Sequence, residues 1–286
     1  MRAKGTLIPI GGNEDKGIEI HEQYKLEYIE EGILSRVVKE SGGNEANIVV
    51  IPTASGIPVE VGQNYLTAFS KLGCENVHVL DIRSQEDAAK KGSIEMILNA
   101  DCIMFSGGNQ SKITKHIGGS KIHDILLDRY KNDEDFVIAG TSAGAMVMTN
   151  EMIAGGSSTE AFIKGAVKMY KGLSLLPGLI IDTHFIKRGR FGRQSEAVAK
   201  YPNLLGIGLA EDTGLVIKRG HEFEVIGSGM IIMFDPKNLT HNNEKILEEG
   251  TPMTMTNLVV HVLSNGDRYD LETRETKVLP IDSPFV

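Results

Sequence analysis

The chain has 286 residues, of which 41% are hydrophobic and 24% charged, a composition typical of a folded globular protein and not of a disordered one. No apolar run approaches the roughly 20 residues of a membrane-spanning helix. The first residues lead into a strand-like run without a signal-peptide core, so a cytoplasmic location is expected. A net charge of −8 makes nucleic acid an unfavourable partner.

Over the first two-thirds of the chain, short apolar runs alternate with longer amphipathic stretches. Helices are predicted at Tyr24–Glu40 and Val61–Leu72, where apolar residues recur at helical spacing. The apolar runs lack polar alternation, as in parallel strands buried on both faces. This alternation of strands and helices favours an α/β fold with a mostly parallel sheet flanked by helices. The predicted strands are Gly5–Gly12, Asn47–Thr53, Val77–Asp81, Asp101–Phe105, Phe136–Ala139 and Leu179–Asp182.

From Leu204 onward the strands follow one another with only turn residues between them, which predicts an antiparallel C-terminal β extension. Asn265-Gly266 between two strand-like runs, Leu258–Ser264 and Arg268–Leu271, predicts a β-hairpin with a type I′ turn. No repeat or linker interrupts the chain, so one domain over residues 1–286 is expected. The remaining strands of the extension are predicted at Leu204–Ala210, Thr213–Lys218, Glu222–Ile226 and Met230–Phe234.

The segment Gly140–Gly144 matches the G-x-S-x-G pattern of a nucleophile elbow. It follows a predicted strand and precedes a helix-compatible stretch, as that turn requires. The two glycines allow the strand and the helix to approach closely, and Ser142 would be exposed at the turn. We therefore predict that Ser142 is a nucleophile and that the backbone N–H of Ala143 stabilises an oxyanion.

A second glycine turn, Ser106–Gln110, follows the strand Asp101–Phe105. In a parallel sheet both turns open at the carboxyl edge, where ligands bind. The backbone N–H groups of Gly107 or Gly108 are therefore candidates to complete the oxyanion hole.

The strand ending at Asp182 leads into a histidine followed by a basic segment. His184 is the candidate general base, since a serine hydroxyl needs a partner that titrates near neutrality. Two glycines between the arginines favour a loop that presents guanidinium groups, and arginine binds carboxylates bidentately. We therefore expect an anionic or carboxylate-bearing substrate. The cations of this segment are Lys187, Arg188, Arg190 and Arg193.

A triad also needs an acid to orient the histidine. Glu211 directly follows a predicted strand and is the preferred candidate. Glu160, in a loop between the serine and the histidine, is the alternative, and Asp182 lies only two residues before His184. No H-E-x-x-H or similar cluster indicates a metal site. The cysteines, Cys74 and Cys102, fit neither a disulfide framework nor a zinc pattern, and we expect both to be buried.

Together these motifs resemble the serine peptidase family S51, which includes cyanophycinases and bacterial aspartyl dipeptidases. The resemblance spans most of the chain, and its most specific part, H-F-x-x-R-G-R-x-G-R, favours the cyanophycinase branch. It is carried by Ile8–Gly12, Pro52–Ser55, Ser106–Gln110, Gly140–Ala145, His184–Arg193 and Leu209–Thr213.

The resemblance implies a class I glutamine-amidotransferase-like sheet, a Ser-His-Glu triad and a cytoplasmic homodimer without a cofactor. The implied substrate is cyanophycin, multi-L-arginyl-poly-L-aspartate, and the implied product is the β-Asp-Arg dipeptide. The alternatives are an α-aspartyl or isoaspartyl dipeptidase of the same family and, less favoured, a non-catalytic binding protein. Thr183 departs from the pattern of the cyanobacterial members, in which glutamine is expected, and an isoaspartyl peptide is the alternative substrate that this departure implies. The implied substrate-binding residues are Gln110, Asp182, Thr183, Arg188, Arg190 and Arg193.

Overall fold

The computed structural model describes residues 3–18, 26–156 and 162–279. Its main sheet has nine strands in the order β15-β14-β11-β10-β1-β5-β4-β2-β3. The five strands from β1 to β3 in this order are parallel, and the four C-terminal strands are added antiparallel beside β1. The strands are β1 (Thr6–Ile10), β2 (Ile48–Ile51), β3 (Val77–Val79), β4 (Cys102–Phe105), β5 (Val137–Thr141), β10 (Thr213–Lys218), β11 (Glu222–Gly227), β14 (Arg268–Asp270) and β15 (Thr276–Lys277).

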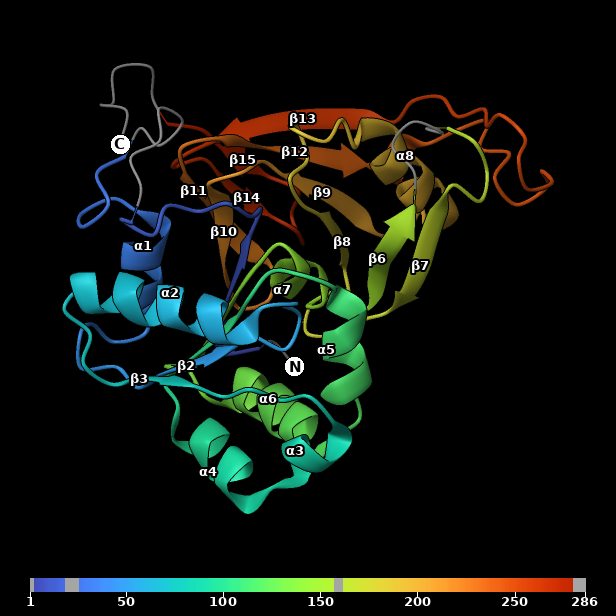
Figure 1. Ribbon diagram of the computed structural model, residues 1–286. Helices are drawn as coiled ribbons and strands as arrows, with labels where there is room; N and C mark the ends of the chain where they lie inside the picture. The colour runs from blue at the N-terminus through green and yellow to red at the C-terminus, as the bar shows by residue number, and fades with distance from the viewer. Residues whose placement is uncertain (1–2, 19–25, 157–161, 280–286) are drawn as a thin grey trace.

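Helices cover both faces of the parallel strands (Figure 1). Successive strand residues point to opposite faces, so Val49 belongs to one core cluster and Val50 to another. This explains why the strands are apolar without alternation. One face is covered by α1 (Ile33–Glu40) and α2 (Pro58–Lys71), and the other by α3 (Gln85–Ala89), α4 (Lys91–Asn99), α5 (Gln110–His116) and α6 (Lys121–Asn132).

A second sheet has four strands in the order β13-β12-β9-β8, with β8 and β9 parallel. In Figure 1 it lies above the short helix α7, beside α8. A separate antiparallel pair is formed by β6 and β7. The elements are α7 (Ala143–Met146), β6 (Glu151–Gly156), β7 (Val167–Lys171), β8 (Leu179–Asp182), α8 (Phe191–Lys200), β9 (Leu205–Leu209), β12 (Met230–Asp235), the 3-10 helix η1 (Pro236–Asn238) and β13 (Val259–Ser264).

The predicted α/β class with an antiparallel C-terminal extension is confirmed. The predicted hairpin is wrong, because β13 pairs with β12 in the second sheet whereas β14 pairs with β11 in the main sheet. Of the turn residues, Gly266 has a positive φ of 83° and Asn265 does not, so no type I′ turn forms. The first two residues of the predicted helix Tyr24–Glu40 lie outside the described residues, and among the described ones the helix begins at Ile33.

Both cysteines are buried and unpaired, as expected. Among the described residues, no helix is both long enough and apolar enough to span a bilayer.

Candidate active site

Ser142 occupies a strained turn between β5 and α7. Its φ of 50° and ψ of −107° lie outside the ordinary regions for a residue with a side chain, as expected of a nucleophile elbow. Its backbone N–H donates to the carbonyl of Ile10 at 2.9 Å, which ties the turn to the end of β1.

The two glycines of the elbow are required by packing. A β-carbon on Gly140 would come within 2.6 Å of the backbone of Gly144, and one on Gly144 within 2.5 Å of the carbonyl oxygen of Phe105. Distances below 3 Å are not tolerated against backbone atoms, so the G-x-S-x-G spacing follows from the close approach of strand and helix.

His184 follows β8, and its imidazole faces the hydroxyl of Ser142. Its Nε2 lies 3.1 Å from Ser142 Oγ, and its own N–H donates to the carbonyl of Gly11 at 2.8 Å. This separation is within hydrogen-bond reach for a general base and a hydroxyl.

Glu211 lies on the far side of the imidazole. One carboxylate oxygen is 2.7 Å from His184 Nδ1, and the other accepts from Lys187 Nζ at 3.0 Å. A carboxylate on Nδ1 fixes the tautomer that leaves Nε2 free to take a proton. The alternative acid, Glu160, lies outside the described residues.

The electrostatics of this pair keep the imidazole neutral and the carboxylate ionised. Burial is the largest cause that lowers the pKa of His184, helped by the positive charges of Arg188 and Arg190 and opposed by Glu211. Burial raises the pKa of Glu211, but the hydrogen bonds from His184 and Lys187 outweigh it, so the pKa lies below its ordinary value.

The predicted oxyanion glycines lie beside Ser142. A β-carbon on Gly107 would be 3.5 Å from Ser142 Cβ. Gly108, with a φ of 138°, packs so tightly on Ala54 that a β-carbon would come within 2.2 Å of its carbonyl oxygen. In the part of the chain that the structure describes, no acceptor binds the N–H of Gly107 or Gly108. Ala143 is buried at the start of α7.

The basic segment is arranged differently from the predicted loop. Asp182 is fully buried and is bound by Arg193, whose Nε donates to it at 2.8 Å, and by Arg190 Nη1 at 2.8 Å. Arg193 belongs to the first turn of α8 and is 5% exposed. The structure therefore pairs these three residues with one another, and Arg188 is the arginine of the segment that is exposed.

The other two predicted contact residues also bind within the protein. Gln110 Nε2 donates to the carbonyl of Ile153 at 2.8 Å. Thr183 is fully buried, and its hydroxyl lies 3.4 Å from Met146 Sδ.

The roles of two residues of the site, Gly12 and Lys187, were not predicted from the sequence. Gly12 packs directly against His184, and the only sequence signal was a glycine pair at the end of a predicted strand. Lys187 belongs to the basic segment that was predicted to bind substrate carboxylates, whereas in the structure its Nζ contacts Glu211. Its partner is 24 residues away, so no local pattern could reveal it.

A serine hydroxyl, an imidazole and a carboxylate joined in this order are the groups of a serine hydrolase. A family model described as Peptidase family S51 matches residues 17–226. A cyanophycinase of Trichormus variabilis is 37% identical over 277 residues, covering 97% of this chain and 88% of the relative. A cyanophycinase of Geminocystis herdmanii is 34% identical, covering 95% of this chain and 96% of the relative.

Among solved structures, a peptidase from an acI-B1 Actinobacterium superposes with a TM-score of 0.63, covering 94% of this chain and 98% of its own. At 18% identity this shows a shared fold. The chain belongs to peptidase family S51 and is a serine-type peptidase.

Proposed function

We propose that this protein hydrolyses cyanophycin to β-Asp-Arg dipeptides through a Ser142-His184-Glu211 triad and an acyl-enzyme. The observation that carries the proposal is the unbroken contact from Ser142 Oγ through the imidazole to Glu211. The relatives named cyanophycinase, 31–37% identical over nearly the whole chain, support the choice of substrate.

The product defines the bond that breaks. A β-Asp-Arg dipeptide keeps its side-chain amide, so the scissile bond is the backbone amide between successive aspartates. Ser142 Oγ attacks the carbonyl of this amide while His184 Nε2 takes the hydroxyl proton. The N–H groups of Ala143 and of Gly107 or Gly108 stabilise the oxyanion that forms.

Collapse of the tetrahedral intermediate expels the backbone amine, which takes the proton from His184. A water molecule then gives a proton to the same imidazole and attacks the ester, releasing the dipeptide acid and restoring Ser142. Glu211 stabilises the imidazolium in both steps. No cofactor enters this scheme.

An exposed arginine beside the triad, Arg188, fits a substrate rich in carboxylates. Arg188 is exposed and close enough to lower the pKa of His184, whereas Arg190 and Arg193 are bound to Asp182. We therefore assign substrate carboxylate binding to Arg188 first. The homodimer and the cytoplasmic location stay predictions.

Mass spectrometry of products from purified polymer tests the proposal. We expect β-Asp-Arg with the wild-type protein and intact polymer with Ser142→Ala. Cleavage of α-aspartyl or isoaspartyl dipeptides with the polymer left intact would favour the dipeptidase alternative. Polymer cleavage by Ser142→Ala would exclude the mechanism.

A further inference from the structure

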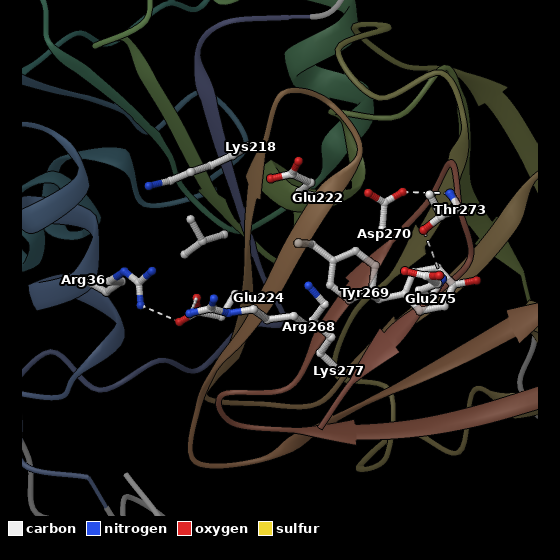
Figure 2. A pocket seen from close by; sticks show the side chains of 12 residues that line it. Arg36, Lys218, Glu222, Glu224, Arg268, Tyr269, Asp270, Thr273, Glu275 and Lys277 are labelled. Atoms are coloured by element: carbon white, nitrogen blue, oxygen red, sulfur yellow. Dashed lines mark hydrogen bonds and ion pairs between the residues drawn. The ribbon is translucent and has the colours of Figure 1, made fainter. Parts of the chain in front are cut away.

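A cavity of about 540 Å³ lies on the C-terminal strands of the main sheet, away from the triad (Figure 2). The strand β10 begins beside the active site, two residues after Glu211, and ends at the cavity with Lys218. At about 3.3 Å per residue, the two ends of this strand are about 17 Å apart. Charges of both signs line the cavity: Arg36, Lys218, Arg268, Lys277, Glu222, Glu224, Asp270 and Glu275.

The strand register sorts these charges into two rows on one face of the sheet. In the first row, Glu222 pairs with Asp270 across β11 and β14. In the second row, Glu224 pairs with Arg268, which pairs with Lys277 of β15. The rows are two residues apart along each strand, which is about 7 Å.

The first row holds two carboxylates, Glu222 and Asp270, and one cation, Lys218 of β10, which is paired with Glu40 at 2.7 Å. The carboxylates of Glu222 and Asp270 offer oxygens within 4.8 Å of each other, although like charges repel at this distance. Backbone N–H groups, with that of Thr273 first, hold the pKa of Asp270 below its ordinary value. The Arg219 partner of Glu222 is 66% exposed, so this ion pair is weak.

The second row concentrates positive charge. Glu224 is shared by two cations, Arg36 at 3.0 Å and Arg268 at 2.9 Å, and Arg36 is also paired with Glu40 at 2.8 Å. Lys277 is exposed and has no ion-pair partner among the described residues. Figure 2 shows Arg36 reaching Glu224 from α1 while Glu222 and Asp270 lie on the other side of the cavity.

We propose that this cavity is an exosite for the arginyl groups of the polymer. Each arginyl group has a guanidinium at one end and a free carboxylate at the other, separated by an aliphatic chain of a length similar to the row spacing. The guanidinium binds between Glu222 and Asp270, and the carboxylate binds Arg268 and Lys277. This inference rests on the proposed function, because the polymer is the ligand.

An exosite at the end of β10 that is remote from the triad anchors the enzyme to an insoluble substrate, which raises the effective concentration of polymer at the triad without changing the chemistry. A short soluble fragment of the polymer cannot span both sites. The exosite therefore predicts a difference between long and short substrates.

The test compares wild type with the double variant Glu222→Gln/Lys277→Met, whose two positions are exposed and outside the core. We expect kcat/KM on polymer granules to fall about tenfold, since two exposed charge contacts are lost, and kcat/KM on a soluble two-repeat fragment to stay unchanged. The control is Glu248→Gln/Lys245→Met, which makes the same chemical changes at exposed residues outside the cavity.

Equal rates on granules for the variant and wild type would overturn the exosite, as would an equal loss on both substrates. Co-sedimentation of Ser142→Ala with granules, with and without the two exosite substitutions, measures binding without turnover. If wild type cleaves no polymer, the proposed function fails. The co-sedimentation result then still decides whether the cavity binds polymer.

Discussion

Gly12 lies so close to His184 that a β-carbon on the glycine would be 2.5 Å from Cε1 and Nε2 of the imidazole. The glycine also has a φ of 103°, which other residues rarely adopt. Gly12, two residues after the end of β1, therefore limits the positions that the imidazole can adopt.

Substitution of Gly12 by alanine should displace the imidazole from the serine. We expect kcat to fall at least tenfold, because misplacement by about 1 Å can cost a hundredfold in rate. Steady-state kinetics measure this, with circular dichroism as a check on folding. Unchanged kcat in Gly12→Ala would show that the imidazole has room to move.

Glu211→Gln should reduce kcat by a hundredfold or more, since an amide does not stabilise the imidazolium. Glu160→Gln is the matched comparison and should leave kcat within about twofold. The opposite ranking of the two variants in the same assay would assign the triad acid to Glu160.

The pH dependence of kcat/KM follows from the depressed pKa of His184. The base must be neutral, and burial together with nearby arginines lowers its pKa, so activity should persist below pH 6.5, the ordinary histidine value, and be lost at lower pH. Arg188→Met removes one of these charges and should move the acid limb to higher pH. A limb that stays in place or moves to lower pH in this variant would contradict the assignment.

Lys187→Met should lower kcat about two- to fivefold, because the lost contact to Glu211 is an ion pair whose lysine is 64% exposed. Lys187→Arg should restore most of the rate by keeping the charge. If arginine and methionine reduce kcat equally, the lysine has no electrostatic role at Glu211.

Arg193→Met should destabilise the fold, because Asp182 is 0% exposed and would lose its main partner. Breaking a buried ion pair costs about 3–5 kcal/mol, so urea unfolding should show a loss of this order. Arg188→Met, at an exposed position, should change the free energy of unfolding by less than about 0.5 kcal/mol. Similar stabilities for the two variants would show that the buried pair contributes little.

The local sequence pattern was sufficient to predict the strand and the turn that surround Ser142. The run before Ser142 is apolar because it is buried on both faces, and the glycines at 140 and 144 are required by contacts within a few residues or with the adjacent strand. The predicted strand Thr213–Lys218 coincides with β10, whose first five residues are buried.

Strand pairings and ion pairs between residues that are distant in the chain could not be predicted from local pattern. The sequence around Asn265-Gly266 is compatible with a hairpin, yet its two strands pair with neighbours in different sheets. The glycines between the arginines of the basic segment favour a loop that presents guanidinium groups to a ligand. Its arginines at 190 and 193 instead neutralise Asp182, whose complete burial depends on tertiary packing.

The residues of the proposed triad come from different sheets: Ser142 follows a strand of the nine-stranded sheet, while His184 and Glu211 follow strands of the four-stranded sheet. The three residues can act together only when the two sheets pack against each other. In the proposed mechanism, a chain in which either sheet is unfolded is therefore expected to have no peptidase activity.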